Sequence, residues 1–382
     1  MKEVYFIADN IVSPLGVTTN ENFTALCRGR SAVTLHHDVT KSNIPFMADL
    51  LDDAVMALQV TNGLQGLTRF EQLLAISIRS VIAQSGIDVT SKKTALIISS
   101  TKGNISLLEN NKISKTLKEQ VSLPAAANKI ADFFNLVTKP IVVSHACISG
   151  LVAIITAKRM LQAGLYENII VAGADIITKF ILSGFQSFQA VSDELCKPFD
   201  ANRKGINLGE AAATVLLSVN KPEQNAVELA GGAISNDANH ISGPSRTGRE
   251  LFQAIDAALQ ESAIPTTDID FISAHGTATM YNDDMESKAI NLAGLQAIPV
   301  NSLKGYFGHT LGAAGLLEVI ISLQSLKDGK IIPTKGFETA GTAEPLNICH
   351  TLIEKQMSAC LKTASGFGGC NAAVIIKKHN II

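Results

Sequence analysis

The stretch IVVSHACISGLVAIITA, residues 141–157, indicates the fold class of the chain. An apolar, β-branched run leads to Cys147, then to Ser149 and Gly150, and an apolar helical pattern begins at once. We therefore expect a buried strand, a tight turn and a helix, in that order. A strand that is apolar throughout, rather than alternating, is typical of a sheet covered on both faces.

The same alternation continues on both sides of this stretch. Apolar runs predict strands at 94–99, 141–146, 168–174, 213–219, 268–274, 297–303 and 372–377. Helix-length amphipathic segments lie between them, among them 150–163, 248–262 and 311–326. This order predicts an α/β fold with largely parallel sheets. No residue-level repeat relates the two halves by eye, and no Pro- or Ser-rich linker divides them.

Composition excludes several classes of protein. The 382 residues are 46% hydrophobic and 17% charged, which indicates a globular chain with a large core. The net charge is −2 and no basic block occurs, so no nucleic-acid partner is expected. No apolar run has the length of a signal peptide or a membrane span. We expect a soluble, cytoplasmic protein with no membrane association.

The chain has six cysteines, and no two of them form a CxxC pair. Neither a zinc site nor a redox pair is therefore indicated, and no metal is expected. Five of the six are interpreted as small buried hydrophobic residues. Cys147 differs because it follows a strand and precedes a helix.

Its position gives Cys147 a chemical interpretation. Unpaired N–H groups and the helix dipole favour an anion there, so we expect a lowered thiol pKa and a thiolate near neutral pH. Small neighbours admit an acyl group, and backbone N–H groups can hold the oxyanion formed on attack. Taken alone, the segment fits a core cysteine better, because buried cysteines are common.

A first histidine segment is FISAHGTATMYNDDME, residues 271–286. The strand ends at His275 beside a glycine, the place where sites of α/β proteins usually lie. An imidazole there can accept or donate a proton near neutral pH. Asp283 and Glu286 fall on the next helix and are expected to orient nearby cations. The alternative is a histidine that only caps a strand.

A second histidine segment is VNSLKGYFGHTLGAAGLLE, residues 300–318. Lys304 and His309 bracket a glycine turn, and a lysine close by would keep the imidazole neutral. The alternative is a lysine at the rim and a histidine that caps a helix. A last glycine turn, 366–369, can bring Phe367 and a backbone N–H against a ligand. Cysteine and both histidines therefore all lie at strand-end glycine turns, which packing alone explains poorly.

These segments, in this order, resemble the β-ketoacyl-acyl-carrier-protein synthases of the thiolase fold, in their elongating branch. The resemblance covers nearly the whole chain. It is carried by IVSPLG (11–16), CRGRSAV (27–33), ACISG (146–150), KPFDANRKGINLGEAAA (197–213), AHGTAT (274–279), NSLKGYFGHTLGAAG (301–315) and GFGGCNAA (366–373).

The resemblance implies a five-layered αβαβα body made of two related halves. Residues 1–222 would carry the nucleophile, and residues 223–382 would carry the two histidines. It implies substrates carried on the phosphopantetheine of an acyl carrier protein, with that carrier as partner and no further cofactor. It also implies a homodimer, or a heterodimer with a sister synthase-like subunit.

The resemblance also implies roles for single residues. Cys147 would be acylated, and His275 and His309 would handle the malonyl unit. Lys304, paired with Glu318, would support the histidines electrostatically. Thr277 and Thr279 would contact the pantetheine arm of the substrate. Phe367 would be an aromatic gate beside the acyl pocket, and its backbone N–H would share the oxyanion hole with that of Cys147. The reaction would extend an acyl thioester by two carbons, in fatty-acid or polyene and polyketide synthesis.

Departures from the family pattern leave the substrate open. His145 replaces a small residue, Ser365 an aromatic one and Cys370 a threonine. Three alternatives remain. A thiolase would need a second catalytic cysteine in the last glycine loop, and a CoA-priming synthase would have Asn in place of His309. A non-catalytic, chain-length-determining partner would lack the nucleophile.

Overall fold

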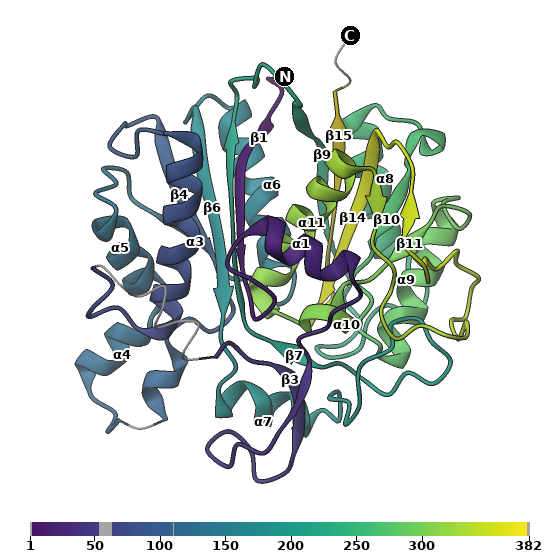
Figure 1. Ribbon diagram of the computed structural model, residues 1–382, viewed down its shortest axis with the longest axis horizontal. Coiled ribbons are helices and arrows are strands. Elements are labelled where there is room, and N and C mark those ends of the chain that lie inside the picture. The colour runs from purple at the N-terminus through teal and green to yellow at the C-terminus, as the bar shows by residue number, and fades with distance from the viewer. Residues whose placement is uncertain (1, 53–62, 110, 380–382) are drawn as a thin grey trace.

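The computed structural model describes residues 2–52, 63–109 and 111–379. Within these residues ten strands form one mixed sheet, in the order β11-β10-β14-β15-β9-β1-β8-β6-β4-β5 (Figure 1). Five of them belong to the first half of the chain: β1 (Tyr5–Val12), β4 (Thr94–Ser99), β5 (Ile141–Val143), β6 (Asn168–Asp175) and β8 (Ala211–Ser218). Five belong to the second: β9 (Val227–Asn236), β10 (Phe271–Ser273), β11 (Val300–Asn301), β14 (Ala359–Gly366) and β15 (Cys370–Lys378).

The two halves repeat one topology. In the first half β5, β4 and β6 are parallel, and β8 and then β1 follow antiparallel. In the second half β11, β10 and β14 are parallel, and β15 and then β9 follow antiparallel. The halves meet where Tyr5 and Phe6 pair with Glu228 and Val227. The thiolase-like fold of two related halves is thus confirmed, although no repeat is visible in the sequence. The boundary expected after residue 222 lies between β8 and β9.

Helices arrange the body in five layers. Helices α6 (Ser149–Gln162) and α11 (Ala314–Asp328) lie side by side between the two halves of the sheet (Figure 1). The outer faces are covered by α3 (Arg69–Ser85) in the first half and by α8 (Arg249–Ser262) in the second. The central helices approach closely at glycines: a Cβ at Gly150 would lie 2.7 Å from the Leu316 backbone N.

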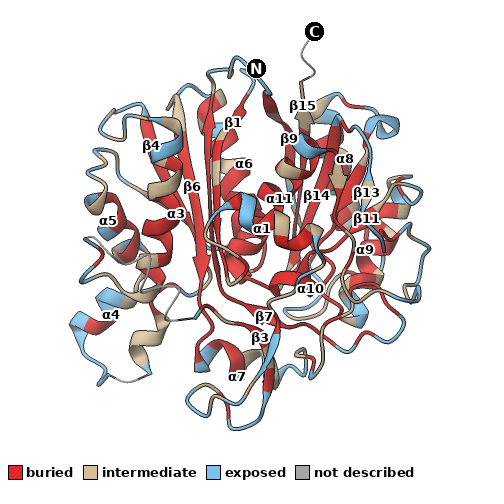
Figure 2. Cartoon of the chain, in the orientation of Figure 1, coloured by how far each residue is buried: buried red, intermediate tan, exposed pale blue. Residues whose placement is uncertain are grey.

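This layering explains the uninterrupted apolar strands. In β4, Leu96 and Ile98 pack in the core beneath α3, whereas Ala95 and Ile97 pack in the core around the central helices. Both faces of each half of the sheet are therefore buried, and Figure 2 shows the strands and central helices almost entirely in the buried class. Alternation of polar and apolar residues has no role in such strands.

The prediction of largely parallel sheets is wrong. Among neighbouring pairs of described strands in the large sheet, four are parallel and five are antiparallel. The antiparallel strands β8 and β15 are buried on both faces too, so burial does not report strand direction. Three strands of the large sheet were not predicted, β1, β9 and β14, because their sequences contain Asp9, Glu228, Lys362 or paired glycines.

The helices begin and end within a few residues of the predicted bounds, but several strands are shorter. β5 ends at Val143 rather than at residue 146, because the backbone turns before Cys147.

The remaining described helices are α1 (Thr19–Cys27), α4 (Lys115–Val121), α5 (Leu123–Phe133), α7 (Lys179–Ser187), α9 (Met280–Leu292), α10 (Lys304–Phe307) and the short η1 (Ile105–Leu108), η2 (Thr266–Asp268) and η3 (Leu311–Ala313). Two small sheets contain β2 (Thr34–His36), β3 (Phe46–Asp49) and β7 (Leu208–Gly209), and β12 (Lys330–Ile331) and β13 (Ile353–Glu354). Among the helices described, none combines the length and apolar character that crossing a bilayer requires.

Candidate active site

Cys147 lies in a strained turn between β5 and α6. The preceding residue, Ala146, has φ +45°, in the left-handed region that non-glycine residues rarely adopt. The Ser149 hydroxyl braces the turn, because it donates to the Ala146 carbonyl at 2.7 Å and accepts from the His145 N–H at 2.8 Å. Strain of this kind persists where the surroundings over-determine the backbone, and here it presents the thiol to a cavity.

The cavity has a volume of about 430 Å³ and takes walls from both halves of the chain. Residues singled out in the sequence supply much of its lining: Cys147, His275, Thr277, Thr279, His309 and Phe367. Four others lie behind the lining, within the surrounding packing: Asp283, Glu286, Lys304 and Glu318. Four segments distant in sequence therefore converge on one site.

The two histidines lie edge to face, with ring centroids 5.2 Å apart. Both are buried, yet Nδ1 of His275 and both ring nitrogens of His309 have no hydrogen-bond partner among the described residues. Buried polar groups are nearly always hydrogen-bonded, so unpaired nitrogens facing a cavity indicate a ligand that binds there. Burial and then the Lys304 cation lower the pKa of both imidazoles well below its ordinary value, which keeps them neutral.

The thiol of Cys147 is not predisposed to ionise. Burial raises its pKa to about 11, although the Phe367 N–H and the Lys304 cation act in the opposite direction. The prediction of a lowered pKa is therefore wrong for the ligand-free site, because desolvation by the cavity walls exceeds the effect of the local N–H groups. Attack must be coupled to loss of a proton, and the neutral imidazoles can accept one.

A buried ion pair lies behind the histidines. Lys304, on α10, pairs with Glu318 on α11, and both side chains are almost wholly inaccessible. A second lysine, Lys362 on β14, lies 2.6 Å from the other carboxylate oxygen of Glu318. The sequence analysis did not single out Lys362, although a lysine inside the apolar run ACLKTASG was a usable signal.

The acidic residues of α9 hold the His275 turn by its backbone. Glu286 accepts from the N–H groups of His275 and Gly276 at 2.8 and 2.6 Å, and Asp283 accepts from the Thr277 N–H at 2.9 Å. Burial raises the pKa of Asp283 to about 7 and also raises the pKa of Glu286. We expected these two carboxylates to orient cations, but they mainly accept hydrogen bonds from backbone N–H groups.

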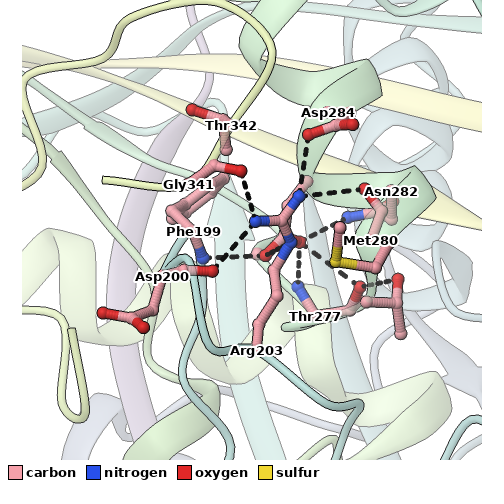
Figure 3. Close-up of polar contacts among 12 residues, drawn as sticks. Phe199, Asp200, Arg203, Thr277, Met280, Asn282, Asp284, Gly341 and Thr342 are labelled. Atoms are coloured by element: carbon pink, nitrogen blue, oxygen red, sulfur yellow. Dashed lines mark hydrogen bonds and ion pairs between the residues drawn. The ribbon is translucent and has the colours of Figure 1, made fainter. Parts of the chain in front are cut away.

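Arg203 is a further lining residue that the sequence analysis did not identify (Figure 3). Its guanidinium donates to the carbonyls of Asp200 and Gly341 at 2.9 and 2.6 Å, and to the Asp284 carboxylate at 2.8 Å. It thereby ties the 199–205 loop to the start of α9, beside the threonines. The Thr277 hydroxyl lies 2.8 Å from the Thr279 hydroxyl at the cavity wall.

Phe367 closes one side of the cavity. Its ring stacks on Phe185 of α7, with centroids 5.7 Å apart, and tilts against Phe188 at 5.5 Å. The glycine before it keeps the nucleophile's amide uncovered, because a Cβ at Gly366 would lie 3.0 Å from the Cys147 N. The N–H groups of Cys147 and Phe367 are thus both close to the thiol.

The three departures from the family pattern occupy different places. The His145 side chain is exposed and is not part of the cavity wall. Ser365 lines the cavity and donates to Asn371 at 2.8 Å. The Cys370 thiol is buried beneath the glycine loop, 3.2 Å from the Phe367 carbonyl.

Comparison with known proteins agrees with this architecture. Residues 1–222 match the protein family described as "Beta-ketoacyl synthase, N-terminal domain". Residues 226–338 match the family described as "Beta-ketoacyl synthase, C-terminal domain". The 3-oxoacyl-(acyl-carrier-protein) synthase 2 of Vibrio harveyi is 27% identical over 400 residues, which cover 96% of each protein.

Two solved structures share the fold. A beta-ketoacyl synthase from Burkholderia phymatum superposes with a TM-score of 0.89 at 24% identity, over 100% of both chains. A ketosynthase in complex with its chain length factor, from Xenorhabdus doucetiae, gives 0.86 at 23% identity, over 99% of this chain and 98% of that one.

The fold and its cavity define a thiolase-fold enzyme of the acyl-transferring class. Within that class, the chain belongs to the beta-ketoacyl synthase family. Its relatives by sequence include proteins named 3-oxoacyl-(acyl-carrier-protein) synthase 2 and others named polyketide beta-ketoacyl synthase, in agreement with the family that the sequence motifs indicate.

Proposed function

We propose that this protein catalyses decarboxylative condensation of an acyl thioester, held on Cys147, with malonyl-acyl carrier protein. The observation that carries the proposal is the convergence of a buried thiol with two neutral imidazoles whose nitrogens are unpaired among the described residues. One cavity then contains a nucleophile, a proton acceptor and two hydrogen-bond donors, which are the groups that the reaction needs.

Acylation comes first. The Cys147 sulfur attacks the carbonyl carbon of the incoming thioester while its proton moves to a neutral imidazole. The N–H groups of Cys147 and Phe367 hold the negative oxygen of the tetrahedral intermediate, as in other acyl-transfer sites. The carrier thiol leaves and takes the proton, so the enzyme keeps only the acyl group.

Decarboxylation follows when malonyl-carrier replaces the released carrier. His275 and His309, each with one N–H in the neutral form, donate to the malonyl thioester oxygen. The carbon–carbon bond to the carboxylate breaks and carbon dioxide departs. The electron pair of that bond stays on the remaining fragment as an enolate, which those two donors stabilise. The enolate carbon attacks the acyl carbonyl on Cys147, the thiolate leaves, and a 3-oxoacyl-carrier two carbons longer is released.

The partners proposed are an acyl carrier protein and a second synthase-like subunit. Relatives named for the acyl carrier protein, and a solved ketosynthase in complex with its chain length factor, support these kinds of partner. β5 ends the order of the large sheet, and the next residues, Ser144 and His145, are exposed beside the nucleophile turn. We propose that the second subunit covers this edge. No cofactor is proposed beyond the phosphopantetheine that carries the substrates.

The test is intact-mass analysis of the protein after exposure to acyl-carrier and acyl-CoA thioesters, followed by malonyl-carrier. An acyl adduct that maps to Cys147, and that disappears as a product two carbons longer forms, supports the proposal. Cys147→Ala should form neither adduct nor product, while its melting temperature stays close to that of the wild type. Condensation by this variant would overturn the assignment of the nucleophile.

A second candidate function is that of a non-catalytic, chain-length-determining subunit. Its supporting observation is that a solved structure of the same fold contains a ketosynthase in complex with its chain length factor, although this chain keeps Cys147, which such a subunit is expected to lack. If no primer acylates the protein alone, the assay is repeated with a sister synthase from the same source. An adduct confined to the sister would favour this second function.

A further inference from the structure

Two lysines share one buried glutamate behind the histidine pair. Lys304 and Lys362 are both 0% exposed, and they contact opposite oxygens of Glu318. One carboxylate suffices to neutralise one lysine, so Lys304 and Glu318 already form a complete pair. Lys362 adds a second cation, and removing its charge from water opposes folding.

Lys362 is anchored to the segment that presents His275. Its ammonium donates to the carbonyls of Ser273 and Ala274, both at 3.1 Å. These are the two residues that precede His275 on β10 and in the turn after it. The ammonium thus donates hydrogen bonds to two carbonyls and forms an ion pair with Glu318, and these contacts hold the side chain in one position.

The charged and titratable groups around the histidines come from every element packed on them: Cys147 before α6, Arg203 from the 199–205 loop, Asp283 and Glu286 from α9, Lys304 from α10, Glu318 from α11 and Lys362 from β14. Glu286 is committed to the backbone N–H groups of His275 and Gly276 and to the Thr363 hydroxyl. Glu318 is shared between two cations. The two lysines, Lys304 and Lys362, are the cations that lower the pKa of both imidazoles.

We propose that Lys362 is a positioning residue of the condensation, which fixes the carbonyls before His275 and adds a second buried cation behind the histidine pair. This inference rests on the proposed function. The added cation opposes protonation of both imidazoles, and it favours negative charge where the enolate oxygen develops. In agreement, the Lys362 cation contributes to the lowered pKa of both histidines, after burial and Lys304, and in His275 also after His309.

The experiment compares Lys362→Met with the wild type in two assays. The first is malonyl-carrier decarboxylation as a function of pH. Loss of the cation raises the pKa of the imidazoles, so the acidic limb of the profile is expected to move upward by about one pH unit. The rate at the optimum should fall about tenfold through kcat, with KM unchanged, because Lys362 does not touch the substrate.

The second assay is titration of the histidine ring protons by NMR in the ligand-free protein. It needs no activity, so it separates this inference from the proposed function. The variant should show protonation of at least one buried imidazole at a pH where both remain neutral in the wild type. Unchanged titration in a folded variant overturns the inference, even if the condensing activity is established.

Two further variants protect the test. Lys362→Gln keeps a donor for the carbonyls and removes the charge, so it should show the same pH shift if the methionine variant does not fold. Lys158→Met removes a matched buried lysine, which contacts Glu261 and the Ala230 carbonyl outside the site. That control should lower stability without moving the acidic limb. An equal shift in the control would mean that general destabilisation, not Lys362, sets the profile.

Discussion

At the scale of single residues, the site keeps its reactive groups uncharged until substrate binds. Burial raises the pKa of Cys147 to about 11 and lowers the pKa of His275 and His309 well below its ordinary value. At neutral pH the free site therefore holds a thiol and two imidazoles. Such a nucleophile reacts slowly with stray electrophiles, because the thiolate is the reactive form.

This charge state makes a prediction for alkylation of Cys147. Below its pKa a thiol is protonated, so the thiolate fraction grows with pH and levels off only near the pKa. The rate of labelling by iodoacetamide should rise about tenfold per pH unit through the neutral and mildly basic range. Peptide mass spectrometry measures the rate at this position, with half-exposed Cys27 as comparison. A rate independent of pH above neutrality would show a thiolate already formed.

His309→Ala should separate the two half-reactions. The imidazole donates to the malonyl thioester, so its loss should slow decarboxylation by about 10²–10³-fold. Acylation of Cys147 should continue, since His275 remains to accept the proton. Release of carbon dioxide from malonyl-carrier and the mass of the acyl-enzyme measure the two steps independently. Loss of both steps would show that the division of roles is wrong.

Residue chemistry was predictable where a motif combined several unusual residues. His275 and His309 each adjoin a glycine, Cys147 lies three residues before one, and the structure brings all three into one cavity. Lys362 and Arg203 were missed for a physical reason. The lysine inside the apolar run 359–366 marked Lys362 as unusual, but the carbonyls and carboxylates that Lys362 and Arg203 contact lie far away in the chain, and no local pattern identifies such partners.

At the scale of elements, the glycine loop between β14 and β15 decides access to the nucleophile's amide. Gly366→Ala would place a Cβ 3.0 Å from the Cys147 N and 3.1 Å from the Cys370 sulfur. The added methyl group should cover an oxyanion donor and slow acylation by about 10²-fold. The rate of acyl-enzyme formation, followed by mass, measures the effect.

The matched control is Gly184→Ala in α7, where a Cβ meets no atom within 4 Å. It should leave acylation unchanged and keep the melting temperature of the wild type or raise it, because alanine favours a helix. If Gly366→Ala acylates as fast as this control, the Cys147 N–H is not part of the oxyanion hole.

The order of elements was predictable, but the direction of the strands was not. Apolar runs such as 94–99 and 168–174 mark buried strands, and the structure confirms both. The direction of a strand depends on how it is connected to its neighbours in the sheet. The parallel and the antiparallel strands are equally apolar, so their sequences do not distinguish the two directions. β9 was missed because its glycines lie where α8 packs against it: a Cβ at Gly231 would meet the Ala258 carbonyl.

At the scale of the whole molecule, the site depends on the fit between two halves. The nucleophile comes from the first half, and both histidines come from the second. One polar cluster joins the halves away from the cavity: Glu261 of α8 contacts Lys158 and Arg159 of α6, the first at 2.5 Å. The same carboxylate accepts from the Gly232 N–H of β9 at 2.9 Å.

This cluster makes a prediction for stability. Although burial acts to raise it, the pKa of Glu261 is lowered to about 2 by Arg159 and Lys158. In the unfolded chain a glutamate titrates at about 4.3. A depressed folded-state pKa contributes stability that is complete above the unfolded value and is lost as pH falls toward the folded value. Glu261→Gln should therefore lower the free energy of unfolding by about 2 kcal/mol at neutral pH, since it leaves Lys158 buried without a counter-charge.

The control for this variant is Glu167→Gln, which removes an exposed pair with Lys93 of similar length, 2.9 Å. Surface pairs contribute about 0–1 kcal/mol, so urea unfolding should barely change. Measured from neutral pH downward, the difference between wild type and Glu261→Gln should shrink below about pH 4.3 as the wild-type carboxylate takes up its proton. A difference that stays constant across that range would mean that the cluster stabilises by packing. The charge of Glu261 would then contribute nothing to holding the two halves together, and protonating it would not loosen the site.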